Sequence, residues 1–362
     1  MVYSAHLADS LPLYGSERVQ LNPRARIAGL GKYLPEHIRT NADIEKLVDT
    51  TDAWIQERTG VRERRIAADN ESASTMGLQA ARQALEQAEV DPAELDLVLA
   101  ATTSPDGMFP ATASLIQDGL GAGKAGAFDV NAACVGFLSA LATGSQFIET
   151  GTYKRVLVVG TEVLSRIVDW TDRDTCILFG DAAGAVVLEA SDRGGPLSFV
   201  LHSDGSGADK LFAHGPATRK DIADRDCHFI SMDGRHIFKF AVQAMESAAR
   251  EAIEAAGMNV DDIDLIVPHQ ANARIIRATA KALGLPEERA MVNVDRYGNT
   301  SSASIPVALR EAWEEGRLHE GDRVVLMTFG GGLSWGSMVL DWAPLGPLSA
   351  AAEPVHATAG GS

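Results

Sequence analysis

The chain has 362 residues, of which 46% are hydrophobic and 22% are charged, which is typical of a globular protein with room for two domain-sized units. No apolar run is long enough to span a bilayer, the first 21 residues lack the apolar core of a signal peptide, and three cysteines favour a reducing cytoplasm over a disulfide framework. The net charge of −17 argues against general affinity for nucleic acid or for an anionic membrane, so neither is an expected partner.

An internal repeat predicts the architecture. Residues 80–100 align without gaps on residues 248–268, at an offset of 168, and eight of the twenty-one pairs are identical. The same offset relates residues 155–159 to residues 323–327, so a chance match of two alanine-rich helices is the weaker interpretation. Each copy has the pattern of an amphipathic helix followed by a fully apolar strand. We therefore expect an α/β fold built from two duplicated βα halves.

The repeat also divides the chain. Residues 1–24 form an N-terminal extension, residues 25–192 the first half and residues 193–344 the second half. Residues 345–362 are rich in Ala, Pro and Gly, which predicts a disordered tail.

Cys134 is the first candidate for chemistry along the chain. A strand-like run leads to it, small residues flank it, and a helix pattern follows. A thiol at a helix N-terminus is favoured as thiolate, which predicts a pKa lowered from about 8.5 to roughly 3.5–7.5. An arbitrary cysteine is more often a buried packing residue. His269 and Asn299, which lie in polar runs of the second half, favour the nucleophile instead.

The offset predicts that these three residues meet. His269 maps onto Ala101 of the first half, and Cys134 maps onto Ser302, three residues after Asn299. We expect all three residues at the carboxyl ends of strands, where ligand sites of α/β folds occur. The first half would supply the nucleophile, and the second half the histidine and the asparagine.

The residue types allow two mechanisms. In a cysteine protease, His269 would deprotonate the Cys134 thiol and Asn299 would orient the histidine. Alternatively, both side chains donate hydrogen bonds to one spot beside the sulfur and stabilise negative charge on a second, incoming thioester. The second arrangement suits acylation of Cys134 followed by attack of a carbanion formed by decarboxylation of a malonyl thioester. The backbone N–H groups of Cys134 and Gly331 would form a second oxyanion hole. The residue pattern alone leaves both mechanisms open.

Seven segments carry a resemblance to a known family. They are TDAWIQERTG (51–60), FPATASLIQDGLG (109–121), FDVNAACVGFLSAL (128–141), ILFGDAAGAVVLEA (177–190), VPHQANARIIRATAK (267–281), YGNTSSASIP (297–306) and FGGGLSWGS (329–337). The chain resembles β-ketoacyl-acyl carrier protein synthase III, a condensing enzyme that starts fatty acid synthesis. The resemblance implies a five-layer αβαβα thiolase-like fold, an acyl-enzyme on Cys134, and decarboxylation driven by His269 and Asn299.

Two rival functions stay open beside it. One is a priming ketosynthase or acyltransferase of a specialised polyketide-type pathway, which the same motifs would serve. The other is a catalytically silent dimer partner, against which the intact Cys134, His269 and Asn299 argue.

The resemblance also implies how thioesters bind. Trp54 and Arg173 would sandwich the adenine of coenzyme A, and Arg58 would meet its phosphates. The pantetheine arm would contact Asn272, Gly234 and Phe238. Coenzyme A thioester enters as a substrate, so no resident cofactor is expected, and the histidine spacing favours no metal site.

A basic stripe follows His269. Arg274, Arg277 and Lys281 lie at i, i+3 and i+7, which places them on one helix face. The simpler interpretation is a solvated helix face. On so acidic a chain, the stripe instead predicts a docking site for the acidic acyl carrier protein, with Lys239 adding to it.

Phe109 precedes a proline after a predicted strand. By itself it would be assigned to the core. The resemblance implies that it crosses the interface of a homodimer and closes the acyl pocket of the partner.

Overall fold

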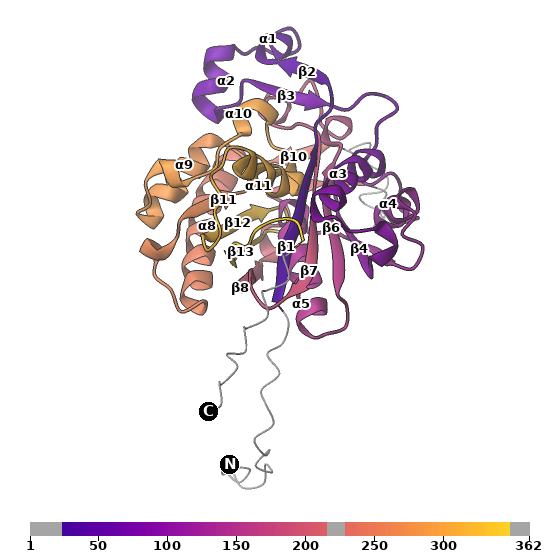
Figure 1. Cartoon of the computed structure of the whole chain (residues 1–362). Helices are drawn as coiled ribbons and strands as arrows, with labels where there is room; N and C mark the ends of the chain where they lie inside the picture. Colours follow the sequence, from indigo (N-terminus) through magenta and orange to yellow (C-terminus); the bar gives the residue numbers. More distant parts are fainter. Residues whose placement is uncertain (1–23, 216–228, 348–362) are drawn as a thin grey trace, which may run out of the picture.

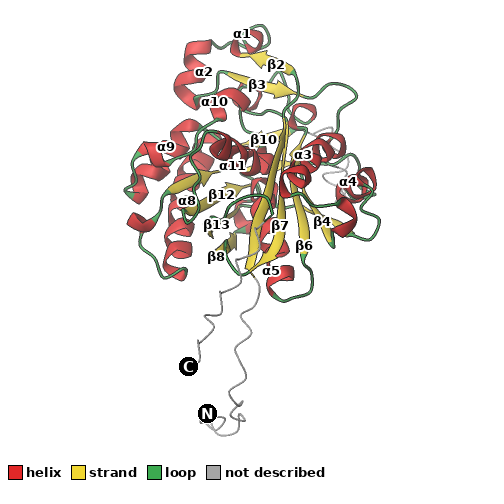
Figure 2. Ribbon diagram, viewed as in Figure 1, coloured by secondary structure: helices red, strands yellow, loops and turns green. Residues whose placement is uncertain are grey.

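The computed structural model describes residues 24–215 and 229–347 (Figure 1). The predicted extension up to residue 23, Cys227 and the tail from residue 348 onward lie outside the described residues. Two β-sheets with helices on their faces make up the body of the protein (Figure 2). Among the described residues, no helix combines the length and the apolar character needed to cross a membrane.

The first sheet has five strands in the order β1-β7-β6-β4-β5. Their bounds are β1 (Arg24–Tyr33), β4 (Leu97–Ala101), β5 (Gly126–Val130), β6 (Arg155–Glu162) and β7 (Ala182–Ser191). β4 is parallel to β5 and β6, whereas β7 is antiparallel to β1 and β6. β5 therefore forms one edge of this sheet.

The second sheet repeats the first. Its order is β11-β12-β13-β8, with β8 (Gly195–Ser203), β11 (Leu265–Pro268), β12 (Arg323–Gly330) and β13 (Ser334–Asp341). β11 and β12 start at the positions that the offset of 168 assigns to β4 and β6. A counterpart of β5 is reduced to one parallel bridge between Ile266 and Ala290. The predicted duplication is confirmed, with this one strand lost.

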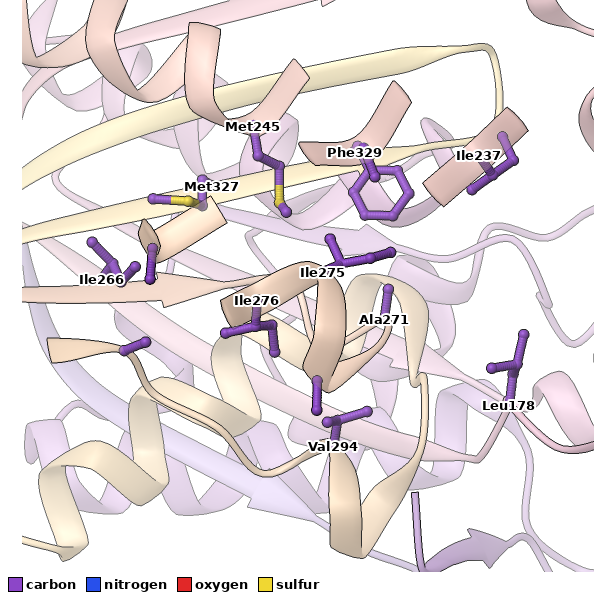
Figure 3. Packing of buried hydrophobic residues seen from close by; sticks show 14 of the residues in the cluster. Leu178, Ile237, Met245, Ile266, Ala271, Ile275, Ile276, Val294, Met327 and Phe329 are labelled. Atoms are coloured by element: carbon purple, nitrogen blue, oxygen red, sulfur yellow. The ribbon is translucent and has the colours of Figure 1, made fainter. Parts of the chain in front are cut away.

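Helices complete five layers. α3 (Ala73–Ala88) and α4 (Thr112–Leu120) cover the outer face of the first sheet, and α8 (Gly234–Ala255) and α9 (Ala273–Leu283) cover the second. α5 (Gly136–Glu149) and α11 (Ser304–Glu314) lie between the sheets, because one buried cluster joins both helices to strands of both sheets. The predicted αβαβα order is therefore confirmed. Figure 3 shows the outer cluster, in which Met245 of α8 and Ile276 of α9 pack over Met327 of β12.

A small lobe sits at one end of the layers, at the top of Figure 1. It contains β2 (His37–Thr40), β3 (Glu63–Ile66), α1 (Asn41–Ile44) and α2 (Asp52–Thr59), with α10 (Val294–Tyr297) packed beside β3. Arg64 attaches the lobe to the rest of the fold, because its buried guanidinium donates to the carbonyl oxygen of Ile177. Within the lobe, the same guanidinium donates to the carbonyl oxygen of Arg39 and to Asn41 Oδ1. Burial lowers the pKa of Arg64 to about 10. Two short elements, β9 (Leu211–Ala213) and β10 (Ile230–Met232), pair with each other.

Glycines in β1 allow α3 to lie directly on the first sheet. A Cβ at Gly31 would overlap the carbonyl oxygen of Ala80 in α3. Small residues on the facing side of α3, including Ala80 and Ala84, are fully buried. The helix thus packs backbone against backbone, with no space for one more methyl group.

We predict that Gly31→Ala lowers the free energy of unfolding by about 1–3 kcal/mol, because an added methyl in a filled core forces a backbone shift. Urea unfolding followed by far-UV circular dichroism measures the change. Gly123→Ala is the matched control, since a Cβ at Gly123 would meet no atom within 4 Å. Equal unfolding midpoints for the two variants would contradict the packing described.

Candidate active site

One cavity of about 860 Å³ joins the two halves. Cys134, His269 and Asn299 all line it, together with Asn131, Ser301 and others. Its wall also includes Leu178, Phe329 and Ile275, which Figure 3 shows among the residues of the outer hydrophobic cluster. The structure therefore brings the three predicted catalytic residues to one hollow, as the offset of the repeat predicted.

Cys134 lies in a short 3-10 turn between β5 and α5. Ala133 opens the turn with a φ of 47°, and α5 begins at Gly136. The second half holds this turn in place. Thr328 Oγ1 donates to the carbonyl oxygen of Cys134 at 2.9 Å, and a Cβ at Gly330 would lie only 2.9 Å from the Cys134 nitrogen.

The predicted low pKa of the thiol is wrong for this structure. Burial raises the pKa of Cys134 to about 12, a hydrogen bond with Ser301 opposes the rise, and the buried Glu162 carboxylate adds to it. The sulfur belongs to the 3-10 turn that precedes α5, and not to the first turn of the helix itself. The thiol is therefore protonated at neutral pH.

His269 directly follows β11, as predicted, and its side chain is 1% exposed. Its Nδ1 lies 2.6 Å from Ser304 Oγ at the start of α11. Its Nε2 is buried and has no hydrogen-bond partner among the described residues. Burial lowers the pKa of His269 to about 3, so the imidazole is neutral at pH 7.

Asn299 does not lie at the end of a strand, which corrects the prediction. It follows α10 and Gly298, whose φ of 65° turns the chain, and forms an isolated parallel bridge with Phe179. The cause is the lost fifth strand, since α10 occupies the repeat position of β5. The Oδ1 of Asn299 accepts a hydrogen bond from the backbone N–H of Ser301 at 2.9 Å. No described residue accepts a hydrogen bond from its Nδ2 group, and Asn299 lines the cavity.

Three hydroxyl residues of the site were missed by the sequence analysis: Ser301, Ser304 and Thr328. Ser301 contacts the thiol and fixes Asn299, Ser304 contacts His269, and Thr328 holds the Cys134 backbone. The repeat could have pointed to Ser301 before the structure was known. The offset places Ser301 opposite Ala133, and both residues have a φ of 47°.

The residues predicted to hold the coenzyme adenine come together at the small lobe. Trp54 and Arg58 lie on α2, and Arg173 opens α6 (Arg173–Cys176). The Arg173 guanidinium carbon lies 4.2 Å from the Trp54 ring centroid, and that of Arg58 lies 5.8 Å from it. A stacked base needs about 3.5–4.0 Å on each side. The Trp54–Arg173 pair must therefore open before a base can insert.

The predicted pantetheine contacts Asn272, Gly234 and Phe238 line the same cavity as Cys134, as does Gly331. Asn272 caps α9 by accepting from the Arg274 N–H at 2.8 Å, and its Nδ2 donates to the Arg58 carbonyl at 3.1 Å. One amide hydrogen and one lone pair of its carboxamide are left for a ligand. The cavity thus extends from the sulfur to the starts of α8 and α9.

The predicted docking residues are exposed on these two helices. Arg274, Arg277 and Lys281 project from α9, and Lys239 projects from α8. The Arg274 guanidinium lies 5.2 Å from the Phe238 ring at the cavity wall, whereas Arg277 is 3.5 Å from the Glu287 carboxylate. Of the four side chains, Arg274 is therefore the one that contacts a residue of the cavity wall.

Phe109 is neither a core residue nor part of this cavity wall. Its side chain is 83% exposed, and its neighbour Met108 is 70% exposed. The core assignment is therefore wrong. Whether Phe109 closes the pocket of a partner stays a prediction.

The raised pKa of Cys134 predicts the pH dependence of its alkylation. Because only the thiolate reacts, the rate with iodoacetamide should rise about tenfold per pH unit from pH 7 to pH 10, without a plateau. Ser301→Ala should slow the reaction at each pH, since the Ser301 hydrogen bond favours the thiolate. Intact mass with peptide mapping separates Cys134 from the buried Cys176. A plateau below pH 8 would show that the thiol pKa is lowered.

Comparison with known proteins agrees with this geometry. Residues 128–205 match the family described as 3-oxoacyl-[acyl-carrier-protein (ACP)] synthase III, and residues 253–342 match its C-terminal part. The β-ketoacyl-[acyl-carrier-protein] synthase III of Clostridium acetobutylicum is 52% identical over 321 residues, which cover 87% of this chain and 98% of that protein.

Solved structures show the same likeness. The synthase III of Thermus thermophilus is 48% identical with a TM-score of 0.84, covering 88% of this chain and 99% of that one. The priming β-ketosynthase from the R1128 polyketide biosynthetic pathway is 38% identical with a TM-score of 0.84, covering 91% of this chain and 99% of that one. The chain belongs to the β-ketoacyl-[acyl-carrier-protein] synthase III family of acyl-transferring condensing enzymes.

Proposed function

We propose that the protein transfers an acyl group from coenzyme A to Cys134 and condenses it with malonyl-acyl carrier protein, the first condensation of fatty acid synthesis. One observation carries the proposal. Neither the Nε2 of His269 nor the Nδ2 of Asn299 has a hydrogen-bond partner among residues 24–215 and 229–347, and both residues line the cavity that holds Cys134. Two polar groups left free beside a nucleophile suit recognition of an oxygen that gains charge during the reaction.

The hydrogen bonds argue against protease-like chemistry. A protease-type asparagine would orient the histidine. Here the partner of His269 is Ser304, and Asn299 bonds to the backbone of Ser301. With its pKa lowered to about 3, His269 is also a weak base for a thiol whose pKa is about 12.

The first step is thiol–thioester exchange. Cys134 Sγ attacks the acyl-CoA carbonyl, the new S–C bond forms, and the bond to the coenzyme sulfur breaks. The proton of Cys134 ends on the departing coenzyme thiol, so the step needs no other acid or base in its balance. The backbone N–H groups of Cys134 and Gly331 stabilise the oxyanion. The close packing of Gly330 on Cys134 supports this role, because it holds the two backbones side by side.

The second step is decarboxylative condensation. Loss of CO2 from the malonyl thioester leaves an enolate, whose oxygen receives hydrogen bonds from His269 and Asn299. The enolate carbon attacks the acyl carbonyl on Cys134, and the cysteine leaves as thiolate and takes up a proton. The products are CO2, the β-ketoacyl carrier protein and the free thiol.

Substrates reach the sulfur from the side of α2, α8 and α9. Coenzyme A binds with its adenine between Trp54 and Arg173, its phosphates at Arg58, and its pantetheine arm along Asn272, Gly234 and Phe238. It leaves after the first step and is a substrate, so the reaction requires no resident cofactor or metal. The carrier protein docks on Arg274, Arg277, Lys281 and Lys239 and delivers its arm through the same opening.

The protein acts as a cytoplasmic homodimer. β5 is a sheet edge, and its Phe128 is 40% exposed, while Met108 and Phe109 are exposed on the loop ahead of α4. An exposed strand edge beside large apolar side chains is suited to pairing with another chain. In this assembly, Phe109 reaches across and closes the acyl pocket of the partner.

A polyketide-type priming role is the second candidate. The likeness to the R1128 priming ketosynthase supports it, and the chemistry at Cys134 would be the same. The two roles differ in the acyl-CoA primer and the carrier protein used. A panel of acyl-CoA primers, assayed with fatty acid and polyketide carrier proteins, separates them.

Each catalytic residue should affect its own half-reaction. After incubation with acetyl-CoA, intact mass should show one acetyl adduct, which Cys134→Ala removes. His269→Ala and Asn299→Ala should still acylate, but condensation with malonyl carrier protein should fall about 10²–10³-fold, the usual cost of one oxyanion donor. Loss of acylation in both variants would instead indicate that these residues activate the thiol.

Charge reversal on the docking surface should act on the carrier substrate alone. Arg274→Glu should raise KM for malonyl carrier protein about three- to tenfold, because exposed charges steer an acidic partner, and added salt should shrink the difference. Acylation from acetyl-CoA should be unchanged. Arg193→Glu is the matched control, since Arg193 is half exposed at the β7–β8 turn in a different part of the fold. Equal effects of the two substitutions would reject the docking surface.

A further inference from the structure

We propose that Ser304 is a positioning residue that decides which ring nitrogen of His269 carries the proton. Its hydroxyl group donates to Nδ1, so that the proton of the neutral ring resides on Nε2, the nitrogen at the cavity. The catalytic purpose of this arrangement rests on the proposed function, whereas the proton placement rests on hydrogen-bond geometry alone.

The contacts of Ser304 Oγ are few and short. His269 Nδ1 lies 2.6 Å from it, and the backbone N–H of Gln270 donates to it at 3.3 Å. These are its hydrogen-bond partners within residues 24–215 and 229–347. Ser304 itself is 2% exposed, so bulk water does not replace them.

The donors and acceptors around the Ser304 hydroxyl indicate which ring nitrogen of His269 carries the proton. A serine hydroxyl has one hydrogen to donate and lone pairs to accept with. The Gln270 N–H already occupies one lone pair, and within the described part of the chain Nδ1 is the one acceptor bonded to the hydroxyl group. If Nδ1 carried the proton, both the hydroxyl hydrogen and the Nε2 lone pair would be buried without a partner, whereas a proton on Nε2 leaves the Nε2–H group alone unpaired until a ligand binds. The geometry therefore favours an unprotonated Nδ1 and an Nε2–H group.

The surroundings hold the ring in this orientation. The Gln270 side chain donates to the carbonyl oxygens of Pro268 and Met291, at 2.8 and 3.0 Å, which fixes the backbone on both sides of the histidine. Phe329 meets the imidazole edge-on, with ring centroids 5.6 Å apart. The imidazole therefore cannot exchange its two nitrogens without breaking contacts on both of its sides.

A hydrogen bond from the same segment determines in the same way which polar atom of Asn299 is left unpaired. The Ser301 N–H occupies Oδ1, which leaves the Nδ2 donor for the cavity. Ser304, three residues later, occupies Nδ1 of His269 and leaves the Nε2 donor. One short segment thus turns both side chains into donors aimed at a substrate oxygen. The neutral state of His269, whose pKa is lowered by burial, is consistent with this role.

The direct test is nitrogen-15 NMR of the full-length protein labelled in its histidine rings, because the chemical shift distinguishes a protonated from an unprotonated ring nitrogen. His269→Ala identifies the signals of this residue by their loss. We expect a neutral ring with the proton on Nε2 at pH 7. A proton on Nδ1 of the wild-type protein overturns the proposal without any Ser304 variant being needed.

The functional test compares Ser304→Ala with Ser145→Ala. Ser145 is a matched control, because its hydroxyl is also buried but donates to the Leu141 carbonyl within α5 and not to His269. Ser304→Ala should move part of the proton to Nδ1 and slow condensation about 10- to 100-fold. Acylation of Cys134 should stay within about threefold, and Ser145→Ala should stay within about threefold in both half-reactions. Ser304→Thr, which keeps the hydroxyl, should restore the wild-type proton placement.

The outcomes separate this proposal from the proposed function. Equal losses of acylation and condensation in Ser304→Ala, or equal effects of the two alanine variants, overturn the role of Ser304. If the wild-type ring carries its proton on Nε2 and the protein fails to condense any malonyl thioester, the proposed function is rejected and the proton placement is upheld.

Discussion

Two equivalent 3-10 turns, residues 133–135 and 301–303, position Cys134 and the segment that follows Asn299. Each turn opens with a residue at a φ of 47° and leads into one of the two central helices, α5 and α11. Each is also held by the sheet of the opposite half. Thr328 and Gly330 of the second sheet hold the first turn, and Ala101 and Glu162 of the first sheet hold the second. The site therefore exists only where the two halves contact each other.

The two turns are equivalent in the repeat, but the residues that surround Cys134 and Ser302 differ chemically. Where Cys134 faces Gly330, its counterpart Ser302 faces Glu162, which accepts a hydrogen bond from Ser302 at 2.8 Å. Glu162 also accepts from Ser104 and from the backbone of Thr103. The glycine lets the two backbones approach closely beside Cys134, whereas a hydrogen-bonded carboxylate occupies the equivalent position beside Ser302. The two equivalent positions thus have different surroundings.

The sequence predicted most of the architecture because a repeat has a period that can be aligned without coordinates. It failed at Asn299, since the second half lost the strand that the first half keeps as β5, and one bridge at Ile266 replaces it. It failed for the thiol pKa because that value depends on burial and on Glu162, which lies 28 residues away in the sequence.

The missed serines illustrate a further limit. A serine in a polar run has many possible partners, and only the 2.6 Å contact with Nδ1 distinguishes Ser304 from its neighbours. The Trp54–Arg173 pair, by contrast, was expected from resemblance, and the structure adds that the pair is closed, at 4.2 Å. A base that inserted between Trp54 and Arg173 would have to break an existing cation–π contact, a cost of about 0.5–1 kcal/mol at an exposed site.

Because each turn is held by the sheet of the opposite half, the order in which the chain is synthesised affects when the site can form. A ribosome completes the segment with Cys134 well before it reaches Thr328 and Gly330, which hold the backbone of that cysteine in the finished protein. Until then, the nascent first half contains Cys134 but not the residues of the second half that complete the cavity around it. The cavity is thus completed late in biosynthesis, when β12 enters the second sheet.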